Sequence, residues 1–217
     1  MKPEEVLSVL KKHVVIPVIA IESAEDALPL ADALIEGGLP VAEITFRTTA
    51  AAAVISRIAR DRPQLVLGAG TILTKENLAA AIDAGVRFGV APGLNPDILA
   101  EANRRGLPFI PGVVTPSEIE QALFLGATLL KFFPAEASGG IPMIKVLSGP
   151  YAHTGARFVP TGGVSAANLA EYLAVPAVAC VGGTWIASKE AIAGKKWTEI
   201  AENCRAAVKI VAAARPS

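Results

Sequence analysis

A lysine stands inside an apolar stretch of the sequence, LLKFFPAE, at residues 129–136. Leu130 and Phe132 are the direct neighbours of Lys131, so we expect a strand that buries its side chain. Burial removes water from an ammonium group and disfavours its charged form, and a neutral amine is a nucleophile that attacks ketones. The protonated imine that results withdraws electrons, so a neighbouring C–C bond can break. The stretch therefore predicts Schiff-base chemistry at Lys131, for which no metal or organic cofactor is required.

Schiff-base chemistry also needs a group that moves protons, and VAEITFR at residues 41–47 offers a carboxylate. Alternate residues of a strand face the same side, so this segment divides into two sets. One set is Val41, Glu43, Thr45 and Arg47, and the other is Ala42, Ile44 and Phe46. The second set is apolar and should pack against helices, which leaves Glu43 facing the interior as a general acid and base.

The same alternation places Lys131 on one face of its strand together with Leu129 and Phe133. If this face is the interior, Lys131 and Glu43 share one cavity. A buried Lys131–Glu43 ion pair without a catalytic role is the alternative interpretation. Because such pairs rarely stabilise a fold relative to apolar residues, the pair favours a function.

Two further side chains could bind a carboxylate. Arg47 follows Glu43 on the same strand face, and its planar set of donors matches a carboxylate. Thr71 closes the run LVLGAGT at residues 65–71 and could donate a hydroxyl to the same anion. The alternatives are a solvated arginine at the rim and a threonine that caps a helix.

Eight short runs rich in Val, Ile, Leu and Phe recur along the chain and are separated by segments with helical periodicity. The runs cover residues 14–21, 41–46, 65–70, 86–91, 108–114, 128–133, 157–162 and 177–183. Strands that are apolar throughout and alternate with helices predict a parallel sheet covered by those helices. We expect an α/β fold, a (β/α)8 TIM barrel with an extra N-terminal helix at residues 3–13, as a single domain over residues 1–217. An open doubly wound sheet is the competing fold, but no GxGxxG follows the first strand.

Several predicted helices open on a hydroxyl residue, which is a typical N-cap. These residues are Thr74, Thr115 and Ser165.

Active sites of barrels lie at the carboxyl ends of the strands, so the loops after the strands are where ligands are expected.

Glycine pairs end the last two predicted strands, in PTGGVS at residues 160–165 and in VGGTW at residues 181–185. Glycine lets a ligand approach the backbone, and the loops after strands seven and eight of a barrel often bind phosphate. We therefore expect a phosphate site there. Its groups are Gly162, Gly163, Gly182 and Gly183, with hydroxyls from Ser165 and Thr184.

The overall composition excludes several classes of partner. Lys plus Arg and Asp plus Glu number 20 each, so no basic field attracts nucleic acid or anionic membranes. The apolar runs are too short to cross a membrane, and the N-terminus lacks a secretory signal. The spacing of Cys180 and Cys204 is not that of metal ligands, so we expect both to be reduced thiols. The two histidines, His13 and His153, also lack partners at metal-ligand spacing. We expect a soluble cytoplasmic protein without a metal.

Six motifs together resemble the 2-keto-3-deoxy-6-phosphogluconate (KDPG) aldolases over nearly the whole chain. They are EITFRT (43–48), GAGTIL (68–73), APG (91–93), LLKFFPAEASGG (129–140), PTGG (160–163) and VGGTW (181–185). The resemblance implies a class I aldolase of the Entner–Doudoroff pathway, which splits KDPG into pyruvate and glyceraldehyde 3-phosphate. It also implies a homotrimer and, in many members, cleavage of 4-hydroxy-2-oxoglutarate.

Carried over by position, the resemblance makes Lys131 the Schiff-base lysine and Glu43 the general acid and base acting through a water. Arg47 and Thr71 would hold the pyruvate carboxylate, and Thr161 would influence which face of the aldehyde is attacked. The remaining substrate-binding residues that it implies are Pro92, Phe133, Gly162, Gly163, Gly182, Gly183 and Thr184.

Two other functions stay open at the level of sequence. One is a phosphate-binding barrel isomerase or decarboxylase in which Lys131 acts as a cation without a covalent intermediate. The other is a catalytically silent barrel that binds a sugar phosphate. A covalent adduct of pyruvate on Lys131 would distinguish the aldolase from both.

Overall fold

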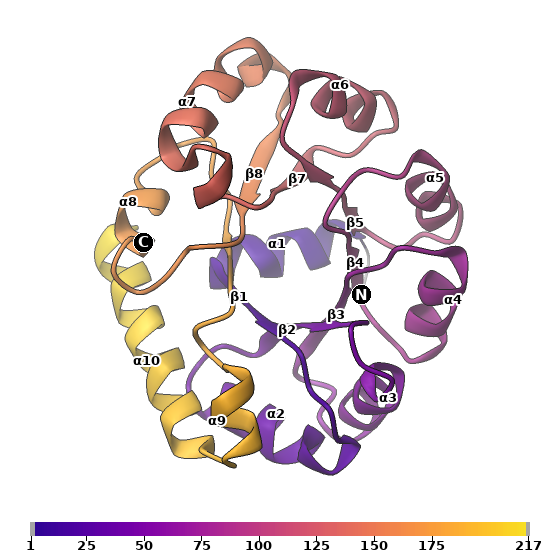
Figure 1. Ribbon diagram of the computed structural model, residues 1–217, viewed down its shortest axis with the longest axis vertical. Helices are drawn as coiled ribbons and strands as arrows, with labels where there is room; N and C mark the ends of the chain where they lie inside the picture. Colours follow the sequence, from indigo (N-terminus) through magenta and orange to yellow (C-terminus); the bar gives the residue numbers. More distant parts are fainter. Residues whose placement is uncertain (1–2, 216–217) are drawn as a thin grey trace.

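The computed structural model describes residues 3–215, and its centre is a curled, entirely parallel set of strands (Figure 1). Six strands pair in the order β5-β4-β3-β2-β1-β9, and three pair in the order β6-β7-β8. The strands are β1 (Val15–Ile19), β2 (Val41–Thr45), β3 (Val66–Gly70), β4 (Phe88–Val90), β5 (Phe109–Ile110), β6 (Gly112–Val113), β7 (Leu129–Phe132), β8 (Arg157–Pro160) and β9 (Val181–Gly183). The predicted α/β class and parallel pairing are confirmed.

The predicted strand over residues 108–114 is wrong in one respect, because it is interrupted at Pro111. Before the proline β5 pairs with β4, and after it β6 pairs with β7. Proline has no N–H to donate to a ladder, and here its carbonyl accepts a hydrogen bond from the Lys131 N–H (2.8 Å). The chain therefore changes pairing partner at this residue and ends one sheet while starting the other.

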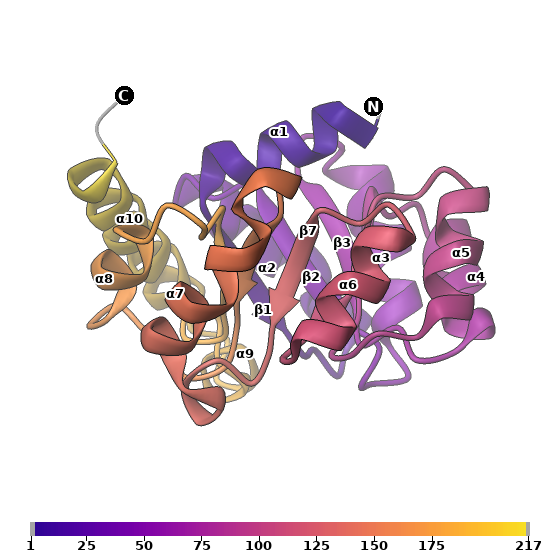
Figure 2. The ribbon, with the colours of Figure 1, turned by 90° about the horizontal axis from the view of Figure 1, so that it is seen from above.

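The helices lie around the strands (Figure 1). They are α1 (Pro3–His13), α2 (Ala27–Glu36), α3 (Ala51–Asp61), α4 (Lys75–Asp83), α5 (Pro96–Arg104), α6 (Pro116–Phe124), α7 (Gly140–Tyr151), α8 (Leu169–Leu173), α9 (Lys189–Ala193) and α10 (Trp197–Ala214). Single 3-10 turns occur at η1 (Ala24–Asp26), η2 (Glu136–Ser138) and η3 (Ala152–Thr154). Helix α1 lies across the end at which the strands begin (Figure 2), so the opposite end is left open for a site. None of the helices within residues 3–215 is long and apolar enough to span a bilayer.

Two of the predicted helix starts are confirmed and one is wrong. The Thr74 side chain caps α4, and Thr115 forms a capping box with Glu118 at the start of α6. Ser165 caps no helix, because α8 begins only at Leu169. The Ser165 N–H donates instead to Asn168 Oδ1 (2.8 Å), and a turn precedes the helix.

The alternation of side chains along the strands divides the apolar residues into two clusters, as predicted. Ala42, Ile44, Leu130 and Phe132 belong to the cluster between strands and helices. Val41 and Leu129 belong to a second cluster inside the curled sheet, and Leu10 of α1 belongs to the same cluster. The interior is therefore apolar where the strands begin. The polar residues that follow on the same strand faces lie nearer the carboxyl ends of the strands.

Candidate active site

Lys131 and Glu43 meet inside the curled sheet. Lys131 Nζ donates a hydrogen bond to Glu43 Oε1 at 3.2 Å, although the two residues are 88 positions apart in sequence. Only 5% of Lys131 and 3% of Glu43 is exposed. The pair lies on β7 and β2, and Gly70 on the adjacent β3 leaves the space for it, because a Cβ at Gly70 would overlap the Glu43 carboxylate.

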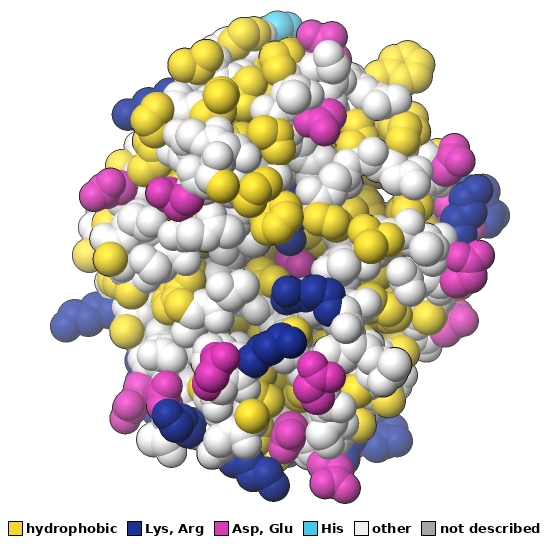
Figure 3. Space-filling model, in the orientation of Figure 1, with side chains coloured by type: hydrophobic (Ala, Val, Ile, Leu, Met, Phe, Trp, Pro, Cys, Tyr) yellow, Lys and Arg dark blue, Asp and Glu magenta, His cyan; other side chains and the backbone are white. Residues whose placement is uncertain are grey.

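The pair lines a cavity of about 210 Å³ at the carboxyl ends of the strands, and Figure 3 shows a hollow with basic and acidic side chains at the centre of this face. Of the predicted site residues, the cavity is lined by Glu43, Arg47, Thr71, Pro92, Lys131, Phe133, Thr161, Gly162 and Thr184. Val18 and Thr45 complete the lining. A volume below the roughly 300–1,000 Å³ of drug-sized pockets suits a small ligand.

Arg47 is held at the rim by a residue that the sequence analysis placed on the same face but did not assign to the site. Thr45 donates its hydroxyl to the Ile19 carbonyl (3.0 Å) and accepts a hydrogen bond from Arg47 Nε (3.2 Å). The two terminal nitrogens of Arg47 have no acceptor within residues 3–215 and remain available to a carboxylate. The signal for Thr45 was the strand alternation itself, since a threonine between Glu43 and Arg47 on one face must also border the cavity.

Thr71, at the end of the neighbouring strand β3, and Phe133, after β7, also line the cavity. Thr71 adopts a φ of 58°, a left-handed conformation that costs a β-branched residue energy and often marks a functional position. The Phe133 ring lies 5.5 Å from Lys131 Nζ, at a distance where its face stabilises a cation. Lys145, the other lysine near this motif, lies exposed on α7 and does not line the cavity.

The predicted phosphate groups are divided between the cavity and its surroundings. Gly162 lines the cavity, whereas Gly163, Gly182 and Gly183 do not. A Cβ at Gly182 would overlap the Thr161 hydroxyl, and one at Gly183 would overlap the Trp185 ring. These two glycines thus make room for neighbouring side chains.

The loop after β8 presents open backbone donors. The N–H groups of Gly162, Gly163 and Val164 have no acceptor within the described residues. Both Gly162 and Gly163 have a positive φ, 96° and 85°, a backbone conformation that glycine adopts without strain. Successive N–H groups of this kind form an anion-binding concavity.

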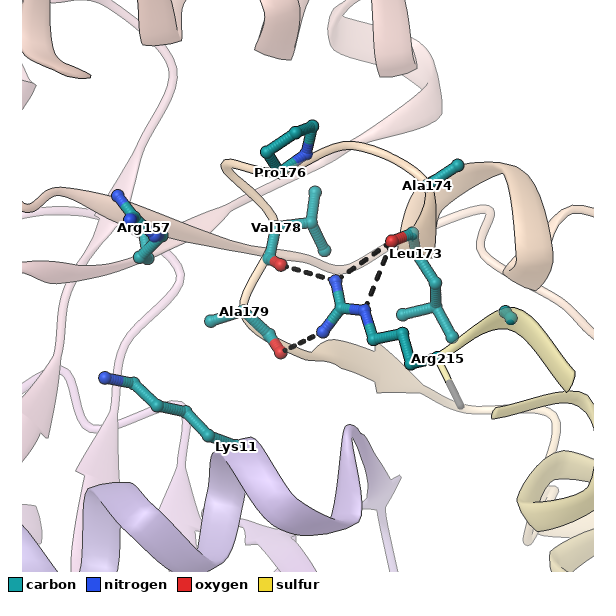
Figure 4. A pocket seen from close by; sticks show the side chains of 9 residues that line it. Lys11, Arg157, Leu173, Ala174, Pro176, Val178, Ala179 and Arg215 are labelled. Carbon is teal, nitrogen blue, oxygen red and sulfur yellow. Dashed lines mark hydrogen bonds between the residues drawn. The ribbon is translucent and has the colours of Figure 1, made fainter. Parts of the chain in front are cut away.

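A larger cavity, of about 540 Å³, lies at the opposite end, where the strands begin. It contains Lys11, Arg157 and Arg215 (Figure 4). Arg215 donates hydrogen bonds to the carbonyls of Leu173, Val178 and Ala179, at distances between 2.7 and 3.2 Å. Its guanidinium therefore fastens the end of α10 to the backbone, and this cavity lacks the pairing of a nucleophile with a proton-transfer group.

The cysteines lie away from the site. Cys180 and Cys204 are both completely buried, and burial raises the pKa of each thiol to about 12. Each is therefore a protonated, inert thiol at neutral pH.

Known proteins resemble this chain in both sequence and fold. The family model described as KDPG and KHG aldolase matches residues 6–203. A 2-dehydro-3-deoxy-phosphogluconate aldolase of Haemophilus influenzae is 44% identical over 96% of this chain and 97% of its own length. The crystal structure of a KDPG aldolase from Legionella pneumophila, with pyruvate captured at low pH as a covalent carbinolamine intermediate, is 42% identical. It matches with a TM-score of 0.89 over 95% of this chain and 98% of that one.

A second solved structure is the 2-keto-3-deoxy-6-phosphogluconate aldolase of Zymomonas mobilis ZM4 with 3-phosphoglycerate. It is 37% identical, with a TM-score of 0.85 over 94% of this chain and 95% of that one. The family model covers most of the chain, and the Haemophilus influenzae and Legionella pneumophila relatives exceed 40% identity over nearly all of it. The chain belongs to the KDPG and KHG aldolase family.

Proposed function

We propose that this chain is a class I aldolase that cleaves KDPG to pyruvate and glyceraldehyde 3-phosphate, and that it also cleaves 4-hydroxy-2-oxoglutarate to pyruvate and glyoxylate. The observation that carries the proposal is the buried Lys131 amine, 3.2 Å from the Glu43 carboxylate in a cavity at the carboxyl ends of the strands. The covalent carbinolamine of the Legionella pneumophila relative supports the same mechanism.

The steps follow from the geometry. The Lys131 amine, after giving its proton to Glu43, attacks the keto carbon of the substrate, and Glu43 passes that proton to the carbinolamine hydroxyl, which leaves as water and gives a protonated imine. Glu43 accepts the proton of the hydroxyl at C4, the bond between C3 and C4 breaks, and its electron pair moves to the imine nitrogen as an enamine. The aldehyde leaves, C3 of the enamine is protonated, and water hydrolyses the imine to release pyruvate and the free lysine.

Two anionic groups of KDPG would span the cavity. Arg47 and Thr71 hold the carboxylate beside Lys131, and Pro92 and Phe133 pack against the three-carbon unit. The open N–H groups of Gly162 and Gly163, with the Thr184 hydroxyl, bind the phosphate, while Gly182 and Gly183 shape the wall behind it. Thr161 faces the aldehyde and influences its stereochemistry. The 3-phosphoglycerate in the Zymomonas mobilis relative supports a phosphate subsite, and binding at this remote group helps to align the reacting carbons.

We further propose that the two sheets complete one closed (β/α)8 barrel, a single domain. The isolated bridges Phe158–Val178 and Thr161–Gly182 support closure, since they join β8 to β9 and the segment before it. The family resemblance supports a homotrimer. The balanced charge, the isolated thiols and the Schiff-base chemistry support a cytoplasmic protein that uses no metal or organic cofactor and binds no nucleic acid or membrane.

The test is an assay of purified protein on KDPG in which pyruvate release is coupled to lactate dehydrogenase. We expect stoichiometric pyruvate and glyceraldehyde 3-phosphate from the native chain and none from Lys131→Met. Release of carbon dioxide, or an isomerised product without pyruvate, would instead support the non-covalent decarboxylase or isomerase.

A further inference from the structure

Asn168 stands at the start of α8 but does not cap it. Asparagine at this position normally accepts a hydrogen bond from an N–H of the first helical turn. Here the side chain makes no such bond. It reaches back to the loop after β8 instead, where Oδ1 accepts from the Ser165 N–H (2.8 Å) and Nδ2 donates to the Gly163 carbonyl (3.1 Å). Helix α8 therefore has no side-chain cap, and both hydrogen bonds of the Asn168 side chain go to the loop after β8.

The bond from Asn168 Nδ2 completes the hydrogen bonding of three consecutive loop carbonyls. The Thr161 carbonyl accepts from the Ala135 N–H (2.8 Å), and the Gly162 carbonyl accepts from the Glu136 N–H (3.0 Å). Asn168 supplies the donor for the third consecutive carbonyl. All three carbonyls thus have donors within the protein.

In a trans peptide the C=O and N–H groups point in opposite directions, so the N–H groups of these three peptides face away from the donors that hold the carbonyls. The three consecutive N–H groups of Gly162, Gly163 and Val164 have no acceptor within the described chain. Ser165 is the first residue whose N–H is again satisfied, and Asn168 satisfies it. The side chain therefore fixes the boundary between the open donors and the rest of the loop.

We infer that Asn168 is a positioning residue that holds these N–H groups in the conformation that binds the substrate phosphate, and that it thereby sets the preference for phosphorylated substrates. The inference rests on the proposed phosphate site. Preorganised donors avoid the cost of ordering the loop when the ligand binds. Only an amide serves both contacts, since one end must accept from an N–H and the other must donate to a carbonyl.

The test uses Asn168→Ala and Asn168→Asp, with Asn95→Ala as the matched control. Asn95 caps α5 conventionally, accepting from the Asp97 N–H (3.0 Å), so its loss weakens a helix start away from the loop. The measurements are kcat and KM for KDPG and for 4-hydroxy-2-oxoglutarate, and the inhibition constant of inorganic phosphate.

Loss of two hydrogen bonds predicts that Asn168→Ala raises the KM for KDPG and the inhibition constant of phosphate about tenfold, with kcat for 4-hydroxy-2-oxoglutarate unchanged. Asn168→Asp should raise the inhibition constant of phosphate further. A carboxylate cannot donate a hydrogen bond to the Gly163 carbonyl, and its negative charge repels the anion. Asn95→Ala should change neither constant.

An unchanged KM for KDPG in both Asn168 variants, or an equal loss with both substrates, would overturn the inference while leaving the phosphate site in place. Failure of inorganic phosphate to compete with KDPG in the native chain would overturn the phosphate site and the inference together. The two failures are therefore distinguishable.

Discussion

At the scale of single residues, the buried Lys131–Glu43 pair is a costly arrangement. Two charges lose most of their hydration there, and one hydrogen bond at 3.2 Å joins them. Apolar residues of similar volume usually stabilise a core at least as well as such a pair. We therefore attribute the pair to catalysis. Replacing both residues together should abolish turnover and leave the free energy of unfolding at or above that of the native chain.

Glu43→Gln should lower kcat for KDPG by about 10²- to 10⁴-fold, the usual contribution of a general acid and base. Pyruvate should still be trapped slowly on Lys131, because the amine remains in place. Steady-state kinetics with the coupled assay checks this prediction, and Asp61→Asn, which changes a partly exposed carboxylate on α3, is the control. Turnover equal to that of the native chain would remove Glu43 from the mechanism.

Lys131→Met leaves the Glu43 carboxylate buried without a cation and should lower the free energy of unfolding by about 3–5 kcal/mol. The double variant Glu43→Gln, Lys131→Met should recover most of this loss and reach or exceed native stability while remaining inactive. Urea unfolding of the three variants is the measurement. A double variant less stable than Lys131→Met would show that the pair is kept for stability.

At the scale of the elements, alternation along the strands predicted most of what positions the site. It placed Glu43 in the interior and the apolar set of β2 against the helices, and it grouped Lys131 with Leu129 and Phe133 on one strand face, which the structure shows to be the interior. It did not predict the break at Pro111, because apolar periodicity does not record which strand a segment pairs with. The predicted helix start at Ser165 is wrong for a related reason. Serine is a typical N-cap, but residue type does not record which groups a side chain bonds in the fold. The N-cap of α8 is Asn168, and its side chain bonds to the preceding loop.

Helix α8 is fastened to the segment after β7 by one side chain. The Tyr172 hydroxyl, on a completely buried residue, donates a hydrogen bond to Glu136 Oε1. Burial, and then this hydrogen bond, raise the pKa of Tyr172 above its usual value. The tyrosine therefore contributes stability that is fully present below its unfolded pKa of about 10 and is lost as the pH rises through the higher folded value.

Tyr172→Phe should lower the free energy of unfolding at pH 8 by about 1 kcal/mol, since the ring stays and one hydrogen bond is lost. The difference from the native chain should shrink above about pH 10, where ionisation of the native tyrosine becomes costly. Urea unfolding between pH 8 and 11 measures it. A difference that stays constant over this range would contradict the assignment.

At the scale of the whole molecule, the two ends of the strands have separate tasks. Helix α1 and its Leu10 close the end where the strands begin, and the site occupies the other end. The composition could not identify the ligand, because it reports only a balance of 20 basic and 20 acidic residues. The fold brings Arg47 and the loop after β8 to the same cavity, although they are far apart in sequence. Composition does not record this proximity.

Catalysis that uses a lysine as electron sink predicts that chelation leaves activity unchanged. Within the described part of the chain no group of three His, Cys, Asp or Glu side chains could hold a metal ion. Dialysis against EDTA followed by the coupled assay should give the native kcat. Activity that is lost and then returns with a divalent cation would contradict this account.

The central claim is that the Lys131 amine attacks the keto carbon of the substrate, and reductive trapping tests it most directly. The chain is incubated with pyruvate, reduced with borohydride, digested and analysed by mass spectrometry. We predict one adduct, on the peptide that contains Lys131, and its absence in Lys131→Met. An adduct on another lysine such as Lys145, or none at all, would contradict the covalent mechanism.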